Sequence, residues 1–333
     1  MLLTIAIPAH NKSKFLKKAI HSIKKEIGFG KDVNIVISDN SLNNEIKELY
    51  LREFNNDVNI ELFNSKKFKC LDSNVNRAVE LSSGKYVWIF GDDDLIVPGI
   101  LKKIKSFLKK NNPSLVILNS KSFRDKEIIE ESRLPKGLKS IYEEYENDLF
   151  LSDLVGYLTY VGGILVDREL WIENYDKSKI GSFFAHITCI TAIKNNRTVH
   201  YFAQPAIKMR LGSQTWIDQS FLIWHKLYPE IIWGLENYNF KAKRNVIHPN
   251  PLNSLKSMIA SRSYGRLTLY NYKKFIFPEK TISIKNKVLI LIISIVPKKL
   301  LSFCYVSFIL LFKKNHSNKF SPKLALAQLK QRK

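Results

Sequence analysis

Short apolar runs alternate with amphipathic stretches over the first 120 residues of this 333-residue chain. Continuous apolar runs of four to eight residues are typical of strands buried in a parallel sheet. Between most of them, apolar residues recur at helical spacing, beginning with the stretch from Ser13 to Ile27. The pattern predicts strands at 2–8, 33–39, 58–63, 86–90 and 114–118, and helices near 13–27, 43–54, 74–82 and 99–110.

This alternation indicates an α/β fold with a doubly wound, mostly parallel sheet. Ligands of such sheets bind beyond the carboxyl ends of the strands. Polar residues follow the predicted strands directly, and we expect them to converge on one rim of the sheet. They are His10 and Asn11 after the first strand, Asp39 and Asn40 after the second, Asn64 after the third, and Asp92, Asp93 and Asp94 after the fourth.

The rest of the chain is less regular. Strands are expected at 160–167 and 198–205 and a helix around 185–194, followed by a helical region from about residue 216. We therefore expect two parts, an α/β domain at 1–215 and a helical C-terminal region at 216–333.

The tail contains two apolar stretches, 288–296 and 300–312, separated by Pro297, Lys298 and Lys299. Two central lysines would each cost roughly 2.5–3.5 kcal/mol in a spanning helix, so a single transmembrane helix is not expected. Two short apolar helices in the membrane interface, with basic flanks, fit better. Packing of both helices onto the catalytic core is the alternative.

The formal charge of +23 arises from 53 Lys and Arg against 30 Asp and Glu. Such an excess attracts polyanions, whether nucleic acid, anionic lipid or phosphorylated substrates, although solvated surface lysines also explain it. No helix-turn-helix, zinc-finger or RNP-like pattern is visible, so nucleic acid is not an expected partner. The three widely spaced cysteines and the absence of a signal-peptide pattern favour the cytoplasm.

Asp92, Asp93 and Asp94, the acid triplet, follow a buried strand in "YVWIFGDDDLIVPG". Adjacent carboxylates repel one another unless a cation offsets the repulsion. Carboxylate oxygens suit Mg²⁺ or Mn²⁺, which keep open positions for substrate phosphates. Capping of a helix that begins near Pro98 is the alternative, but it accounts for one acid better than for three.

Several segments together resemble the family 2 glycosyltransferases of the GT-A fold. These are "TIAIPAHNKSKFLKKAIHSI", "IVISDNS" and "NRAVELSSGKYVWIFGDDD", while "YVGGILVDRELW", "IGSFFAHITCITAI" and "QPAIKMRLGSQTW" are similar to the abequosyltransferase branch, which builds O-antigen units. The resemblance covers about 215 positions. It implies a GT-A, Rossmann-like domain with a helical extension.

The resemblance also implies roles for individual residues. Pro8, Ala9, His10 and Asn11 would surround the nucleotide base and ribose, Asp39 would accept a hydrogen bond from the base, and Asn76 would lie near the nucleotide or donor sugar. The acid triplet corresponds to the family's D-x-D region in one of two registers. One register uses Asp93 and Asp94, with Gly91 at the first acid, and the other uses Asp92 and Asp94.

Two further residues depart from or extend that pattern. His186 stands where many inverting members carry an acidic general base, and histidine can serve as a base near neutral pH. A purely structural histidine is the alternative. Arg210 matches an R-x-G pattern and would bind the diphosphate with its guanidinium group, or it is an ordinary surface arginine.

The implied activity is a metal-dependent transfer of a sugar from a nucleotide-diphosphate sugar to a hydroxyl of a lipid-linked saccharide. The acceptor would be polyprenyl-diphosphate-linked, in synthesis of O-antigen, capsule or lipooligosaccharide. The protein would act as a peripheral enzyme on an anionic membrane surface, the inner face of the bacterial inner membrane. A catalytically silent scaffold on the same fold and a basic nucleic-acid-binding protein remain alternatives.

Overall fold

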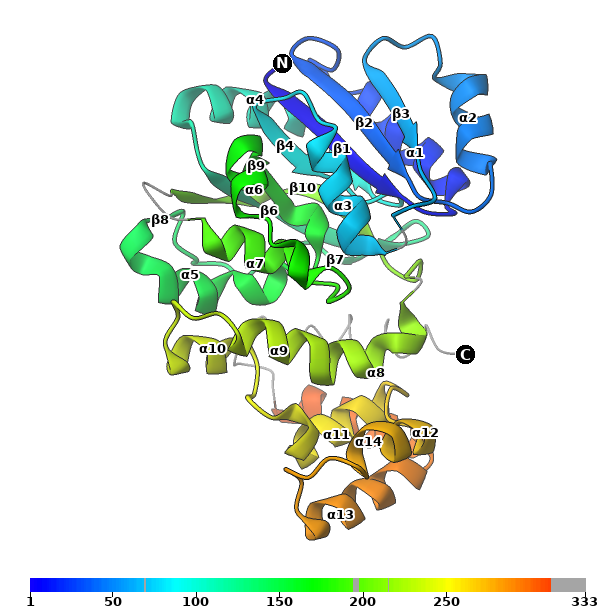
Figure 1. The fold of residues 1–333 in the computed structure, drawn as a ribbon, viewed down its shortest axis with the longest axis vertical. Helices are drawn as coiled ribbons and strands as arrows, with labels where there is room; N and C mark the ends of the chain where they lie inside the picture. Colours follow the sequence, from blue (N-terminus) through cyan, green and yellow to red (C-terminus); the bar gives the residue numbers. More distant parts are fainter. Residues whose placement is uncertain (69, 194–197, 215, 313–333) are drawn as a thin grey trace. The chain divides into compact units, whose positions relative to one another are not determined.

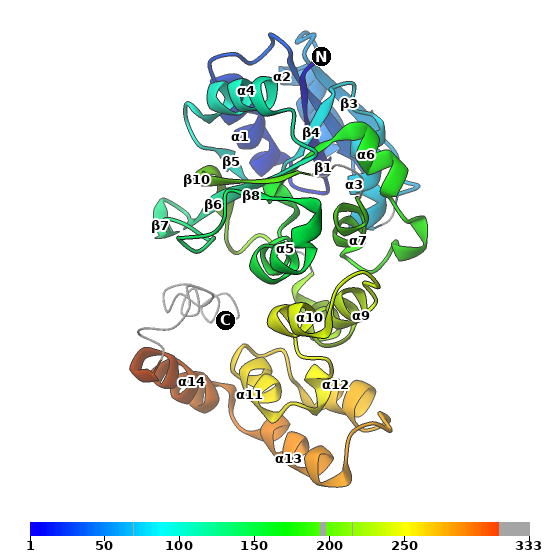
Figure 2. The same ribbon diagram turned by 90° about the vertical axis from the view of Figure 1, so that its left-hand side faces the viewer.

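The structure, a computed structural model, describes residues 1–68, 70–193, 198–214 and 216–312 (Figures 1 and 2). It divides into two compact units, Met1–Arg210 and Leu211–Lys333. The first unit contains the sheet and its flanking helices. The described part of the second unit contains helices and connecting turns. The prediction of an α/β domain followed by a helical region is thus confirmed at the level of fold class.

The described residues of the first unit form one ten-stranded sheet with the main order β3-β2-β1-β4-β9-β6-β10-β5. β7 pairs with β6, and β8 pairs with β10. The strands are β1 (Leu3–Ala9), β2 (Val33–Asp39), β3 (Ile60–Asn64), β4 (Tyr86–Ile89), β5 (Leu95–Ile96), β6 (Leu115–Arg124), β7 (Glu127–Glu130), β8 (Ile141–Tyr142), β9 (Ile164–Asp167) and β10 (Val199–Arg210).

The four strands β3, β2, β1 and β4 run parallel, as the continuous apolar runs predict. Their register aligns the carboxyl ends, because Ala9 lies opposite Asp39 and Asp39 lies opposite Asn64. Gly84, which precedes β4, is required by packing, since a Cβ there would lie 2.5 Å from the backbone nitrogen of Thr4. This half of the sheet brings the predicted polar residues to one edge.

Beyond β4 the sheet is mixed. β9 lies between β4 and β6 and runs antiparallel to both. The predicted strand at 160–167 is shorter than expected, because residues 161–163 form a 3-10 turn before β9 begins. The carbonyl of Gly162 in that turn accepts a hydrogen bond from the buried indole of Trp88 at 3.0 Å. The turn is therefore fixed against β4.

Helices cover both faces of the sheet (Figures 1 and 2). In α1 the buried side chains are Leu16, Ala19, Ile20 and Ile23, which confirms the helical periodicity. The helices of the first unit are α1 (Ser13–Lys24), α2 (Glu45–Glu53), α3 (Leu71–Glu80), α4 (Ile100–Asn111), α5 (Asn147–Asp153), α6 (Arg168–Asn174) and α7 (Ala185–Ala192).

The second unit has its own small apolar core, which includes Phe221, Met258, Leu267, Ile276 and Ile290. Its described helices are α8 (Ser220–Leu222), α9 (Tyr228–Trp233), α10 (Phe240–Val246), α11 (Leu255–Ser263), α12 (Leu269–Asn271), α13 (Ile284–Ile295) and α14 (Lys298–Phe312). The last two helices confirm the expectation of two apolar helices broken at Pro297.

Both tail helices contact α11. Arg262 of α11 donates from Nη2 to the carbonyl of Val296 at 2.8 Å. This hydrogen bond satisfies a backbone carbonyl at the break between the two helices. Within the described part of the chain, no single helix is long and apolar enough to cross a membrane. α13 and residues 298–305 pass that test only as a pair, bent by 102°.

Candidate active site

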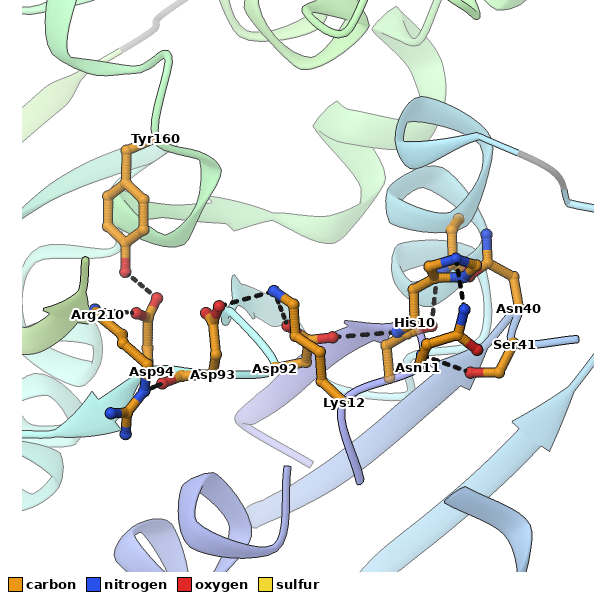
Figure 3. Close-up of polar contacts among 12 residues, drawn as sticks. His10, Asn11, Lys12, Asn40, Ser41, Asp92, Asp93, Asp94, Tyr160 and Arg210 are labelled. Carbon is orange, nitrogen blue, oxygen red and sulfur yellow. Dashed lines mark hydrogen bonds and ion pairs between the residues drawn. The ribbon is translucent and has the colours of Figure 1, made fainter. Parts of the chain in front are cut away.

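The turn after β1 joins the ends of β1, β2 and β4. The backbone nitrogen of His10 donates to Asp92 Oδ2 at 3.0 Å, and its ring Nδ1 lies 2.9 Å from Asn40 Oδ1. Asn11 adopts a positive φ of 54° and donates from its backbone nitrogen to Ser41 Oγ at 2.8 Å. The polar residues that follow three separate strands therefore meet, as the sequence predicts (Figure 3).

Asp39 ends β2 and is completely buried. Its Oδ2 accepts a hydrogen bond from Asn64 Nδ2 at 2.7 Å, and its Oδ1 accepts one from the backbone nitrogen of Ser41 at 2.8 Å. Buried carboxylates are stable only when they are hydrogen-bonded in this way. Asp39 and Asn64 thus form a fixed polar floor beside the His10 turn.

Two asparagines of α3 occupy different environments. Asn74 accepts from Ser38 Oγ at 2.7 Å and donates to the carbonyl of Ala9 at 3.3 Å, so it lies at the carboxyl ends of β1 and β2. Asn76 accepts from the indole of Trp171 at 3.1 Å and donates to Glu80 at 2.9 Å. The structure brings Asn74, and not Asn76, into contact with the rim; a nucleotide contact by Asn76 stays a prediction.

The acid triplet spreads its side chains in different directions (Figure 3). Between the first two acids lies the ammonium group of Lys12, which is 3.1 Å from Asp92 Oδ1 and 2.7 Å from Asp93 Oδ2. Lys12 belongs to the same turn as His10 and comes directly before α1. One short segment therefore contacts both Asn40, at the end of β2, and the acids.

Asp94 faces away from Lys12 toward β10. It accepts a hydrogen bond from the Tyr160 hydroxyl at Oδ2 and one from the backbone nitrogen of Arg210 at Oδ1, the latter at 2.8 Å. Gly91 allows this position, because a Cβ on residue 91 would collide with Asp94 Oδ2. An acid at residue 91, where the first register puts the family's first carboxylate, would displace the Asp94 carboxylate seen here.

Burial changes the protonation of this cluster. It raises the pKa of Asp92 to about 6, an effect that Lys12 partly opposes, and it raises the pKa of Asp94 to about 7, with repulsion from Asp93 adding to it. Burial also raises the pKa of the Tyr160 hydroxyl well above its ordinary value, so the hydroxyl remains a donor. For Lys12, burial lowers the pKa, but Asp92 and Asp93 outweigh it and the net direction is upward.

Arg210 lies at the end of β10. Its Nε donates to the backbone carbonyl of Asp93 at 2.9 Å, and its guanidinium carbon lies 4.6 Å and 4.5 Å from the ring centroids of Phe15 and Phe123. Stacking and the hydrogen bond hold the guanidinium beside the acid triplet. The structure thus places Arg210 beside the acid triplet, and binding of a diphosphate by its guanidinium stays a prediction.

His186 lies in the first turn of α7 and is only 4% exposed. Its Nε2 donates to the carbonyl of Leu158 at 2.7 Å, two residues before Tyr160. Asp72 accepts from the backbone nitrogens of Gly181, Phe183 and Ala185 and so fixes the loop that leads to His186. Burial lowers the pKa of His186, which keeps the ring neutral.

A divalent ion fits this chemistry as a partner of one or two acids and a diphosphate. No group of three His, Cys, Asp or Glu side chains converges on a metal position in the part of the chain that the structure describes. A cation nevertheless belongs here, because the ammonium of Lys12 already lies between two carboxylates. Mg²⁺ in proteins commonly binds one or two carboxylates plus substrate phosphates.

Sequence reasoning missed Lys12, Tyr160, Asn74 and Asp72. The sequence position of Lys12 could have indicated it as a site residue, since it directly follows the polar turn after the first strand. Tyr160 had no such signal in the sequence, because it reaches Asp94 across 66 residues and through the antiparallel part of the sheet. These side chains complete the site in three dimensions.

Comparisons with known proteins agree with this geometry. Residues 4–160 match the model of glycosyl transferase family 2. The abequosyltransferase RfbV of Salmonella typhimurium is 25% identical over 226 residues, which cover 63% of this chain and 67% of that protein. The GalNAc(5)-diNAcBac-PP-undecaprenol beta-1,3-glucosyltransferase of Campylobacter jejuni is 24% identical over 318 residues, covering 90% of this chain and 95% of its own length.

Among solved structures, residues 1–349 of S. aureus TarS superpose with a TM-score of 0.56 at 12% identity, covering 99% of this chain and 89% of that one. The same protein with UDP-GlcNAc gives a TM-score of 0.55 at 11% identity, covering 88% and 90%. At this identity the likeness establishes the fold.

Proposed function

Because residues 4–160 match the model of glycosyl transferase family 2, we propose that this chain belongs to that family and transfers a sugar from a nucleotide-diphosphate sugar to a hydroxyl of a lipid-linked saccharide. The observation that carries the proposal is the rim at the ends of β1, β2 and β4, where Asp39, His10 and the acid triplet meet. Such rims are the ligand sites of open α/β sheets.

The donor would lie along this rim. Pro8, His10 and Asn11 would surround the base and ribose, and Asp39 would accept a hydrogen bond from the base. Arg210, held beside Asp93, would bind phosphate oxygens, for which a planar guanidinium has matching geometry. Figure 3 shows His10 and Asn11 on one side of the acid triplet and Arg210 on the other.

Mn²⁺ or Mg²⁺ would be held by Asp94 together with Asp93 or Asp92, according to the register. When bound, the ion would neutralise charge on the diphosphate as it leaves. Tyr160 and the backbone nitrogen of Arg210 keep the Asp94 carboxylate in place for that role. Preorganised groups of this kind need no rearrangement during the reaction.

We also propose His186 as the base that receives the acceptor proton, with a defined alternative. Its Nε2 is engaged by Leu158, so only Nδ1 could take up that proton. In the alternative, His186 holds the segment that carries Tyr160 and acts by positioning. His186→Gln can still donate to Leu158 but cannot act as a base, whereas His186→Ala can do neither.

Turnover distinguishes the two roles when nucleotide affinity is measured beside it. Loss of about 100-fold or more in turnover in both variants, with nucleotide affinity unchanged, supports the base. Retention of turnover in His186→Gln, with loss in His186→Ala, assigns positioning instead.

The relatives and the composition of the second unit support a proposal for the acceptor and the location. The name of the Campylobacter relative includes an undecaprenol-linked saccharide. Residues 211–333 carry 21 Lys and Arg against 4 Asp and Glu, so they would be attracted to anionic lipid. We propose that the chain works as a peripheral enzyme at the inner face of a bacterial inner membrane, in synthesis of a surface polysaccharide such as O-antigen.

Thermal stabilisation by CDP, UDP and GDP, each with and without Mn²⁺, tests the donor site. We expect one nucleotide to raise the melting temperature in a Mn²⁺-dependent way, and Asp94→Asn to abolish this rise. Asp32→Asn, which changes an exposed carboxylate, is the matched control and should leave the rise intact. If folded wild-type protein responds to no nucleotide, the proposed function is wrong and a catalytically silent scaffold is favoured.

A further inference from the structure

The acid triplet already contains a cation that belongs to the chain itself. The Lys12 ammonium contacts both Asp92 and Asp93, and the side chains are only 18%, 10% and 14% exposed, in that order. A buried ion pair is sensitive to the loss of one partner, because the remaining charge is left uncompensated. Lys12 therefore offsets part of the negative charge of the acid triplet.

A diphosphate and a divalent ion would change this balance. The incoming divalent ion would compete with the ammonium for Asp93 or Asp92, since each of the two registers includes one of the carboxylates that Lys12 contacts. Lysine carries its charge on a flexible four-carbon stem with three rotatable donors. Released from the acids, the ammonium would lie in the turn that also carries His10, beside the rim where we place the donor.

We propose that Lys12 is a resident cation that is exchanged during donor binding. In the free enzyme the Lys12 ammonium pairs with Asp92 and Asp93. When the divalent ion enters, the ammonium moves to a phosphate oxygen of the nucleotide diphosphate. The inference rests on the proposed function for the identity of the donor. Lys12 would then be a donor-binding residue, and the exchange would favour joint arrival of metal and nucleotide.

Two affinities, measured separately, test the exchange in the full-length protein. The first is the affinity for Mn²⁺ alone, by isothermal titration. The second is the affinity for CDP, UDP and GDP at saturating Mn²⁺. In Lys12→Met we expect Mn²⁺ alone to bind about 10-fold more tightly, because the competing cation is gone, and the best nucleotide to bind about 10-fold more weakly.

Controls separate these shifts from general damage. Lys18→Met removes an exposed lysine from α1 and should change neither affinity. Lys12→Arg keeps a positive charge and should bind Mn²⁺ no more tightly than wild type. Lys12→Gln is neutral but retains a hydrogen-bond donor, so it replaces Lys12→Met if that variant does not fold.

Opposite shifts of the two affinities support the exchange, whereas a merely structural role would weaken both. Unchanged or weaker Mn²⁺ binding in the neutral variants overturns the proposal, and so does nucleotide binding that stays at the wild-type level. If wild type binds no nucleotide at all, the proposed function fails, while the Mn²⁺ measurement still reports whether Lys12 competes for the acids.

Discussion

Residues 1–210 carry 32 Lys and Arg against 26 Asp and Glu, whereas residues 211–333 carry 21 against 4. The second unit therefore supplies +17 of the formal charge of +23. In the first unit, acids such as Asp39, Asp72 and Asp94 are buried and accept hydrogen bonds from within the unit. Most of the net charge of the whole chain thus belongs to the second unit. The buried acids of the first unit are not apparent from the net charge.

Apolar side chains show the opposite contrast. The strands of the first unit bury theirs, while α13 exposes a continuous apolar face made of Ile284, Val288, Ile292 and Ile295. These positions follow helical spacing, and Leu300 and Phe303 of α14 are exposed as well. An apolar helix face in a strongly basic unit is typical of proteins that bind anionic membranes. This contrast is the reason that we propose different partners for the two units, a nucleotide for the first and a lipid surface for the second.

The largest effect is expected when charges are introduced into the exposed apolar face of α13 in the second unit. Val288→Glu with Ile292→Glu should weaken binding to anionic phospholipid vesicles by about 100-fold or more, because two apolar side chains no longer leave water. Gln219→Glu with Asn237→Glu makes the same change in charge at exposed polar positions and should weaken it far less. Equal losses in both double variants, measured by vesicle cosedimentation, would assign the binding to charge alone.

The next largest effect is expected from substitution of two asparagines of the first unit, one of which should affect stability and the other nucleotide binding. Asn76→Ala leaves Trp171 and Glu80 without their partner, so we expect the free energy of unfolding to fall by about 1–3 kcal/mol with nucleotide affinity unchanged. Asn74→Ala, at the rim, is expected to weaken nucleotide binding. Urea unfolding and nucleotide titration of both variants test this. Weakened nucleotide binding in Asn76→Ala alone would restore the role implied by the family resemblance.

A smaller effect concerns acid sensitivity of the second unit. Burial, together with nearby Arg266, lowers the pKa of His225 from 6.5 to about 4. The unfolded chain therefore takes up a proton first, and stability is lost as the pH falls below 6.5 toward 4. The protection factors of residues 221–233 in hydrogen exchange, which correct for the slower intrinsic exchange at low pH, should fall between pH 7 and pH 5. In His225→Gln this fall should be smaller, and an identical fall would exclude His225 as its cause.

The acid triplet is expected to give the opposite sign. The pKa of Asp94 is raised from 3.8 to about 7, so between these values the folded first unit holds a proton that the unfolded chain has lost, and stability decreases as the pH rises from about 4 to about 7. Asp94→Asn removes this dependence. The difference in free energy of unfolding between the variant and wild type should therefore shift in favour of the variant between about pH 4 and pH 7 and stay constant above about pH 8, and a difference that does not change with pH would mean that Asp94 does not titrate there.

Much of the fold could be predicted because it depends on local periodicity. The strand at 33–39 agrees with β2 in full, and the predicted rim is confirmed by the contacts among His10, Asn40 and Asp92. The antiparallel insertion of β9 could not be predicted, since strand pairing depends on partners that are distant in sequence. The contact between Tyr160 and Asp94 could not be predicted either, because the two residues are also distant in sequence.

The sequence by itself determined the α/β class, the resemblance to glycosyltransferase family 2, and the residue types at the rim, because apolar periodicity and motif spacing are properties of short segments. Only the tertiary structure decided which groups share charge and hydrogen bonds. It placed the Lys12 ammonium between two carboxylates 80 and 81 residues away, and it set His186 against the Leu158 carbonyl. Electrostatic energies depend on distance and burial, and neither is encoded in the local order of residues.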